Sequence, residues 1–350
     1  MRFATSSFVR CLIAVPVAAA LVGLGMILPG GGRVAHGGAP AASQATPPHG
    51  ILGDAHTHDP SLARTRTGWY VFSTGDPQVA GGAIQIRYSR DGRTWSSAGT
   101  VGTAIPSWVG QAVPGVSNLW APDVSYHDGQ WYLYYAASTF GSNRSVIGLF
   151  TNPTLDPRDP RYGWVDQGLV TESNVTDDYN AIDPSLFVDH TGAAWLTLGS
   201  YWSGVKLIPV ELPSGKPATA QPPRVSLVDR HFGPNAVEAP YLVEHGGWYY
   251  LLVSFDSCCQ GANSTYREVM GRSRTVGGPY LDRAGVSMLA GGGSALLDGE
   301  GGMRGPGGAS VSGDVLAFHY YDAARQGDFH LGLARLDYRD GWPTIVELRI

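Results

Sequence analysis

Four carboxylic acids recur at nearly regular intervals along this 350-residue sequence, each beside the start of an apolar stretch. They are Asp59, Asp123, Asp183 and Glu238, and the spacings between them are 64, 60 and 55 residues. Two carboxyl groups can hydrolyse a glycosidic bond when one protonates the leaving oxygen and the other activates water or attacks the sugar carbon. Acids with this spacing would supply such chemistry if the fold brought them into one pocket.

The acids belong to an internal repeat of an apolar strand, a Gly-containing turn and an aromatic-rich second strand. Clear copies span residues 59–72, 122–135, 183–198 and 238–252, and a degenerate copy spans residues 307–321. Each repeat has room for a four-stranded antiparallel sheet, and the 48 Gly and 24 Pro residues favour short strands joined by tight turns. The sequence therefore predicts an all-β fold, a five-bladed β-propeller of four-stranded antiparallel blades over residues 46–350. Because the innermost strands of a propeller converge on one axis, we expect the acids to face a common central pocket.

A single Asp-Pro or Glu-Ala-Pro sequence is also a common way to begin a strand at a turn. Three equivalent acids in one funnel are harder to explain as turns, because like charges brought together without a task are destabilising. The repeat therefore favours Asp59, Asp183 and Glu238 as functional residues.

The N-terminus has the pattern of a secretory signal. Arg2 and Arg10 flank a polar start, an apolar run covers residues 11–28, and Ala39-Pro40-Ala41 offers a cleavage site. Residues 1–45 are therefore predicted to be a signal peptide and a Gly/Ala/Pro-rich linker, and the mature protein is predicted to be secreted and extracellular. An uncleaved membrane anchor is the alternative, since 18 apolar residues lie near the lower limit for a span.

Charge and cysteine content narrow the range of partners. The net charge of −5 is mild, and no Lys/Arg run with interleaved aromatic residues supports a nucleic-acid surface, so a neutral substrate fits better. Cys11 lies within the predicted signal, which leaves only the adjacent Cys258 and Cys259 in the mature chain. A long-range disulfide scaffold is thus excluded, and the pair forms either a vicinal disulfide or two buried thiols.

Three short blocks around the acids resemble the active-site blocks of glycoside hydrolase family 43. They are His58-Asp59-Pro60-Ser61, the stretch from Asn180 to Ser185, and Val237-Glu238-Ala239-Pro240. Further stretches are similar to the endo-α-1,5-L-arabinanase branch of that family: residues 118–123, 199–204, 255–261, 271–273 and 319–322. The resemblance covers roughly residues 48–345, with every block in order.

The resemblance implies hydrolysis of α-1,5-linked arabinofuranosides with inversion, and a substrate that is arabinan or a pectic side-chain polysaccharide. It implies Asp59 as general base, Glu238 as general acid and Asp183 as the modulator of the acid's pKa and orientation. A carboxylate near the acid would raise its pKa and keep it protonated near neutral pH. The family gives Asp123 no catalytic role, so a structural turn is expected there. The enzyme is expected to act as a monomer, free of membrane once the signal is removed.

The resemblance also implies further site residues. His319 falls where the family places a histidine that helps bind a central cation, usually calcium with water ligands. One imidazole is a poor calcium site, because calcium prefers ~6–8 oxygen ligands, and a lone histidine is more often a core residue. Trp120 would offer its ring to a sugar or serve as a buried structural residue. The other expected substrate contacts are Gly141, Asn180, Ala181, Ile182, Ser200, Tyr201 and Trp202.

One position departs from the pattern, because Gly308 follows Gly305-Pro306-Gly307 where arabinanases of this kind commonly carry a histidine. Three rival functions also stay open: a β-xylosidase or α-L-arabinofuranosidase on the same fold, a sialidase, and a non-catalytic carbohydrate-binding propeller. The sialidase lacks the arginine cluster it would need, and its Asp-box-like stretch at residues 89–95 is one residue short. Endo and exo cleavage cannot be told apart from the sequence, since loops at the ends of the groove decide between them.

Overall fold

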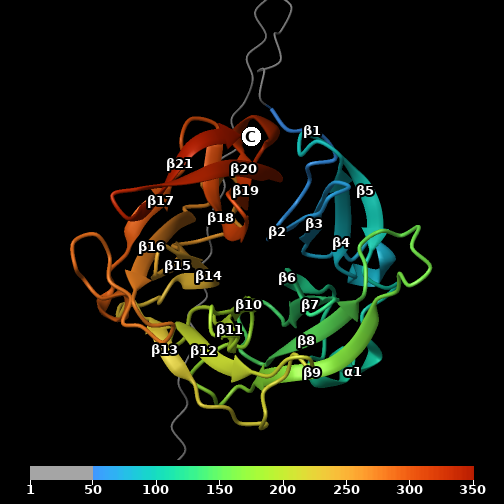
Figure 1. The fold of residues 1–350 in the computed structure, drawn as a ribbon, viewed down its shortest axis with the longest axis horizontal. Coiled ribbons are helices and arrows are strands. Elements are labelled where there is room, and N and C mark those ends of the chain that lie inside the picture. The colour runs from blue at the N-terminus through green and yellow to red at the C-terminus, as the bar shows by residue number, and fades with distance from the viewer. Residues whose placement is uncertain (1–49) are drawn as a thin grey trace, which may run out of the picture. The chain divides into compact units, whose positions relative to one another are not determined.

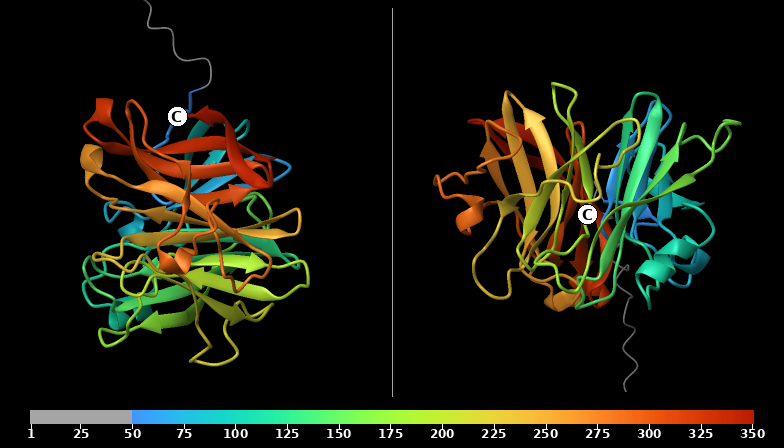
Figure 2. Two further views of the ribbon diagram at one scale, coloured as in Figure 1. Left: turned by 90° about the vertical axis from the view of Figure 1, so that its left-hand side faces the viewer. Right: turned by 90° about the horizontal axis from the view of Figure 1, so that it is seen from below.

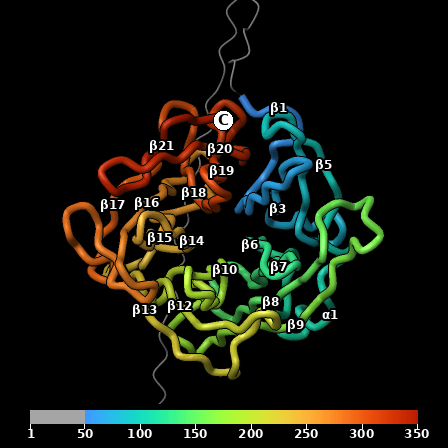
Figure 3. The backbone as a smooth tube through the Cα atoms, viewed as in Figure 1, coloured from blue at the N-terminus to red at the C-terminus, as the bar shows by residue number. Residues whose placement is uncertain are grey.

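The computed structural model describes residues 50–350, which form five β-sheets arranged around a central axis (Figure 1). The predicted all-β five-bladed propeller is confirmed. The chain runs through the blades in order, so that consecutive blades are neighbours (Figure 3). The predicted signal peptide and linker, residues 1–45, lie outside the described residues. Within residues 50–350 no helix is long and apolar enough to cross a membrane.

Each blade is an antiparallel meander whose first strand lies innermost (Figure 1), and Figure 2 shows the blades from the side. Blade 1 contains β2 (Ser61–Arg64), β3 (Trp69–Ser73), β4 (Gln85–Ser89) and β5 (Thr94–Thr100), and blade 2 contains β6 (Trp120–His127), β7 (Gln130–Ala137), β8 (Ser145–Asn152) and β9 (Val165–Ser173). Blade 3 contains β10 (Ser185–Val188), β11 (Ala194–Leu198), β12 (Val205–Val210) and β13 (Val225–Val228). Blade 4 contains β14 (Val237–His245), β15 (Trp248–Phe255), β16 (Arg267–Ser273) and β17 (Ser294–Leu297), and blade 5 contains β18 (Met303–Ser312), β19 (Val315–Asp322), β20 (Asp328–Arg339) and β21 (Trp342–Arg349).

Blade 1 differs from the predicted four-stranded form. The short strand β1 (Leu52–Gly53) pairs in parallel with β5 at the outer edge of the sheet, which gives this blade a fifth strand. The α-helical element of the described chain, α1 (Ser107–Ala112), lies in the connection from blade 1 to blade 2. Four 3₁₀ turns complete the elements: Ala80–Gly82, Gly261–Asn263, Met288–Ala290 and Ala323–Arg325.

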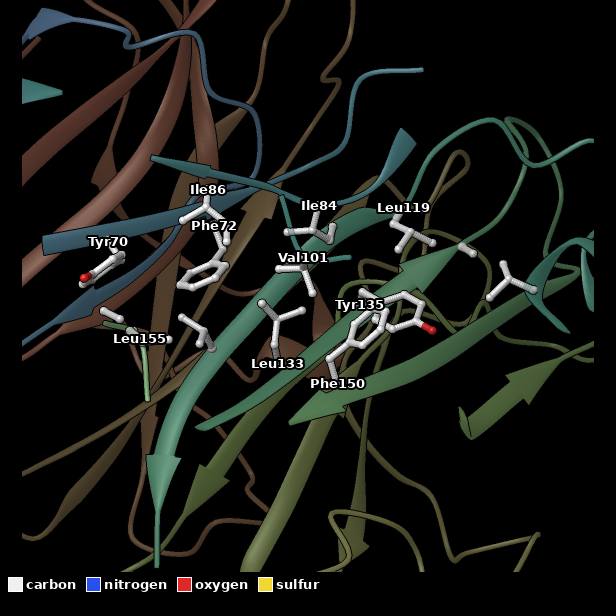
Figure 4. Close-up of a cluster of buried hydrophobic side chains, with 14 of the residues drawn as sticks. Tyr70, Phe72, Ile84, Ile86, Val101, Leu119, Leu133, Tyr135, Phe150 and Leu155 are labelled. Carbon is white, nitrogen blue, oxygen red and sulfur yellow. The ribbon is translucent and has the colours of Figure 1, made fainter. Parts of the chain in front are cut away.

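Apolar side chains fill the space between adjacent blades. In the cluster between blades 1 and 2, Phe72, Ile84, Leu133 and Tyr135 are fully buried and pack together (Figure 4). Each such side chain stabilises the fold by ~1.5–3 kcal/mol through burial. Because similar clusters join every pair of neighbouring blades, the inner strands are held rigidly around the axis.

Blades 5 and 1 close the ring through side chains. The backbone N–H of Leu62 donates to Ser310 Oγ at 3.1 Å, and that hydroxyl donates to the carbonyl of Pro60 at 2.7 Å. An apolar cluster that includes Trp95 and Leu331 packs across the same junction. This closure brings the start of blade 1 against blade 5, although about 250 residues separate them in sequence.

Every inner strand bends or begins at one residue in the left-handed backbone region. These residues are Asp59, Ala121, Asp183, Ala239 and Gly308, with φ between 41° and 61°. A proline follows four of them, at positions 60, 122, 184 and 240, and fixes the exit of the chain. Asp59 and Asp183 occupy this bend itself, whereas Glu238 lies one residue before it and Asp123 two residues after it. The expectation that the four acids are equivalent is therefore wrong, because an offset along a strand points the side chain in another direction.

Candidate active site

Residues from all five blades line a cavity of about 570 Å³, and Asp59, Asp183 and Glu238 are among them. Aromatic side chains contribute much of the remaining wall: Trp120, Phe140, Tyr266, Tyr321 and Phe329. A second, smaller cavity of about 40 Å³ is lined by the bends of the five inner strands, and Asp59 and Asp183 border both cavities. The structure thus brings the three predicted acids together, although 179 residues separate the first from the last.

Asp59 is held as an anion. Its Oδ2 accepts hydrogen bonds from His58 Nδ1 at 2.8 Å and from Thr74 Oγ1 at 2.6 Å. Burial raises the pKa of Asp59, but His58, His319 and the Thr74 hydroxyl outweigh burial and hold this pKa well below its usual range. Asp59 is therefore equipped to accept a proton from water.

Glu238 is buried, and both of its carboxyl oxygens meet a hydroxyl group. Ser200 Oγ donates to Oε2 at 2.5 Å, and Tyr266 Oη donates to Oε1 at 2.8 Å. Burial raises the pKa of Glu238, the two hydroxyls lower it, and the charge of Asp59 raises it again, so that the net pKa lies above the ordinary value. A carboxyl group in this state can keep a proton near neutral pH.

Asp183 lies beside Glu238 and completes the group. Its Oδ2 accepts the backbone N–H of Ala239 at 2.9 Å, directly after the acid. Burial raises the pKa of Asp183 well above its ordinary value, and the charges of Glu238 and Asp59 raise it further. Because two adjacent buried carboxyls resist carrying two negative charges, Asp183 and Glu238 together retain a proton that an isolated acid would lose.

Asp123 lies outside this group and has a structural task. It is buried in β6, where its Oδ2 accepts the backbone N–H of Leu186 at 2.8 Å and so joins blade 2 to blade 3. Burial raises the pKa of Asp123 to about 7, although the hydrogen bond from the Leu186 N–H lowers it. A structural role was expected here, but the expected turn is wrong, since the residue pairs with Tyr134 inside a strand.

The expected substrate contacts separate into lining residues and supporting residues. Trp120 and Ile182 line the large cavity, and the Trp120 ring lies 5.3 Å from that of Phe140. Ser200 reaches Glu238, as described above. Asn180 and Ala181 are buried in hydrogen bonds to Ser145 and Ser173. Gly141, Tyr201 and Trp202 do not line the cavity; Gly141 is exposed beside Phe140, and Trp202 is 39% exposed.

Several residues that touch the acids were not singled out from the sequence. Thr74 and Tyr266 donate to Asp59 and Glu238 from outside the motif blocks. Phe140, which does not touch the acids, is 84% exposed and lines the cavity next to Trp120. In this segment, the sequence predicted a substrate contact only for the neighbouring Gly141. Thr74 and Tyr266 have no local sequence signal, because their partners lie 15 and 28 residues away.

The ring of His319 occupies the space beside Gly308. A Cβ atom at position 308 would lie 2.9 Å from both Asp59 Oδ1 and His319 Nδ1, and the φ of 61° also favours glycine. The missing histidine of this position is thus explained by the fold, because any side chain here would collide with His319 and Asp59.

His58, Asp59 and His319 are close enough together to be considered as a metal site. Burial lowers the pKa of His319 well below its ordinary value, so its ring is neutral and has one lone pair. That lone pair, on Nδ1, accepts the backbone N–H of Asp59 at 3.1 Å, and Nε2 therefore holds the proton. His58 uses both ring nitrogens in bonds to Asp59 and Tyr321. These residues do not fit calcium, which prefers ~6–8 oxygen ligands.

Cys258 and Cys259 form a disulfide, which decides between the two alternatives left by the sequence. Both residues line the large cavity. The backbone of Cys259 is left-handed, with φ of 65°, and its N–H donates to Tyr321 Oη at 2.8 Å.

A propeller whose cavity gathers one ionised carboxylate and two carboxyls of raised pKa has the composition of a glycoside-hydrolysing enzyme. The model of the glycosyl hydrolases family 43 matches residues 52–343. The extracellular endo-α-(1→5)-L-arabinanase 1 of Bacillus subtilis is 41% identical over 289 residues, which cover 82% of this chain and 87% of that relative. The extracellular exo-α-(1→5)-L-arabinofuranosidase of Cellvibrio japonicus is 38% identical over 305 residues, which cover 83% and 86%.

Among solved structures, the family 43 endo-arabinanase from Bacillus licheniformis is similar with a TM-score of 0.79 and 40% identity. The match covers 85% of this chain and 99% of that structure. The chain therefore belongs to glycosyl hydrolases family 43, and the resemblance found in the sequence is confirmed.

Proposed function

We propose that this protein is a secreted endo-acting arabinanase that hydrolyses α-1,5-linked arabinan, or the pectic side chains that contain it, with inversion at the anomeric carbon. The supporting observation is the division of protonation states in one cavity: Asp59 is held ionised, while Glu238 beside Asp183 has a raised pKa. An inverting reaction needs such a base and such an acid at the same time.

In the proposed reaction, Asp59 takes a proton from a water molecule, whose oxygen attacks the anomeric carbon of the sugar. Glu238 gives its proton to the glycosidic oxygen, so that the leaving chain departs as an alcohol. Asp183 and Glu238 are coupled and resist carrying two negative charges, so the pair retains a proton for the reaction, and Asp183 also fixes the backbone next to the acid by accepting the N–H of Ala239. The rings of Trp120 and Phe140 offer apolar faces to the sugar units.

The named activities of the relatives support arabinan as the substrate, and their description as extracellular supports secretion through the N-terminal signal. The proposed enzyme acts as a monomer. Analysis of products from linear arabinan, beside xylan and an aryl α-L-arabinofuranoside, tests the proposal. Short oligosaccharides of mixed length are expected. Arabinose or a single short product from the chain ends would show exo cleavage, and activity on xylan alone would refute the substrate. NMR of the first product anomer tests inversion.

A further inference from the structure

The described chain connects the Cys258–Cys259 disulfide to Asp59 through an unbroken line of hydrogen bonds. The N–H of Cys259 donates to Tyr321 Oη at 2.8 Å, Tyr321 Oη meets His58 Nε2 at 2.8 Å, and His58 Nδ1 meets Asp59 Oδ2 at 2.8 Å. The line joins blades 4, 5 and 1, and its residues line the large cavity. Neither Cys259 nor Tyr321 has a task in the reaction described above, and His58 enters it only as a hydrogen-bond donor to Asp59.

The direction of the first and last bonds follows from the groups involved. An ionised carboxylate only accepts, so His58 must donate from Nδ1. Tyr321 Oη accepts the N–H of Cys259 and shares the next hydrogen bond with His58 Nε2. Both ring nitrogens of His58 and the Tyr321 hydroxyl are thus engaged along the line.

The His58 ring is also fixed from the sides. It stacks on His319 with ring centroids 3.8 Å apart, and it meets the edge of Phe329 at 5.1 Å. Packing therefore sets the plane of the ring, and the bond to Tyr321 sets its rotation within that plane. If the His58 ring rotated, its Nδ1 would no longer donate to Asp59 Oδ2.

We propose that His58 and Tyr321 are positioning residues for the catalytic base, and that the Cys258–Cys259 disulfide anchors them. The disulfide joins consecutive residues in a small ring, which restricts the backbone of Cys259 and holds its N–H toward Tyr321. Opening the ring frees that backbone, so Tyr321 loses its anchor and the orientation of Asp59 is less well defined. This proposal rests on the role of Asp59 as base.

The central experiment combines Tyr321→Phe with reduction of the disulfide. The variant keeps the ring of Tyr321 and removes only its hydroxyl. We expect kcat on linear arabinan to fall at least about 10-fold with KM nearly unchanged, since misplacing a reacting group affects the chemical step. Tyr280→Phe is the matched control, because this buried tyrosine donates to the carbonyl of Val276 away from the cavity, and it should behave as wild type.

Dithiothreitol adds two electrons and two protons to the disulfide and is itself oxidised to a cyclic disulfide. Besides Cys11 in the predicted signal, Cys258 and Cys259 are the sole cysteines of the sequence, so the reagent has one target in the mature chain. Reduction should lower the kcat of the wild type, and reoxidation should restore it. Reduction should not lower the kcat of Tyr321→Phe any further, because this variant lacks the Tyr321 hydroxyl through which the disulfide is proposed to act.

Two further measurements separate positioning from a general structural effect. His58→Asn retains an amide near the place of Nδ1 and should keep more activity than His58→Ala. An aryl α-L-arabinofuranoside should not rescue Tyr321→Phe, because a good leaving group replaces the acid and not the base. Equal loss in wild type and Tyr321→Phe on reduction, a raised KM with unchanged kcat, or rescue by the aryl substrate would overturn the proposal. Wild-type enzyme inactive on arabinan would instead overturn the proposed function.

Discussion

Replacing Tyr266 by phenylalanine removes the hydroxyl that donates to Glu238, the proposed general acid, and leaves the aromatic ring in place. The Tyr266 hydroxyl donates to Glu238 Oε1 at 2.8 Å, and Ser200 continues to donate to Oε2. The Tyr266 ring also packs near His319, with centroids 5.8 Å apart, and a phenyl ring preserves that contact. The variant therefore tests a single hydrogen bond to the acid.

The sign and size of the effect follow from which form of Glu238 the bond favours. A hydroxyl that donates to a carboxylate stabilises the ionised form, so its loss raises the pKa of Glu238. Hydrogen bonds to charged groups contribute ~1.5–3 kcal/mol, and one pKa unit corresponds to about 1.36 kcal/mol. Since Ser200 stays in place and the neutral acid also keeps part of the interaction, we expect a rise near the lower end, about one unit.

The pH dependence of kcat/KM on linear arabinan measures this change. The alkaline limb reports deprotonation of the free enzyme's acid, so it should move to higher pH by about one unit in Tyr266→Phe. Tyr280→Phe, which removes a buried hydroxyl elsewhere, should leave the limb in place. A limb that stays fixed or moves to lower pH in Tyr266→Phe would refute the assignment of that limb to Glu238.

Four further predictions follow from the same geometry. Asp59→Asn and Glu238→Gln should each lower kcat at least ~10²-fold. An aryl α-L-arabinofuranoside should partly restore the activity of Glu238→Gln but not that of Asp59→Asn. Restored activity in both variants would contradict the assigned roles. Asp183→Asn should move the alkaline limb of kcat/KM to lower pH, since removing one of two adjacent carboxyls that resist a second negative charge lowers the pKa of Glu238, and an upward shift would argue against modulation. The pKa of Asp123 is about 7 in the fold, whereas its ordinary value is 3.8. The free energy of unfolding should therefore decrease as pH rises from about 4 to about 7, because the folded state holds a proton that the unfolded state has lost. Asp123→Asn should therefore gain stability relative to wild type over that range in urea titrations, and a constant difference would contradict the shift. Chelation by EDTA should leave activity and Tm unchanged because the imidazole lone pairs near Asp59 are already used, and a fall that calcium reverses would show that a cation binds.

The sequence alone was enough to predict the propeller and the meeting of Asp59, Asp183 and Glu238 in one cavity. The repeated bend followed by proline, as in Asp59-Pro60 and Asp183-Pro184, is local, and each copy specifies the same inner-strand start. Repeats of similar length build similar sheets, and closing five sheets into a ring necessarily brings the bends together. Glu238 was found from the same pattern, although its bend lies one residue later, at Ala239.

Only the tertiary structure decided what surrounds each acid. Tyr321 meets His58 across 263 residues, and Asp123 meets the backbone of Leu186 across 63, and no local pattern indicates either pairing. Asn180 lies in a motif block, yet its side chain is turned to Ser145 in the blade interior. Hydrogen-bond partners and pKa values depend on distances of a few ångströms between strands that meet only when the ring closes, whereas strand periodicity is a property of the chain itself.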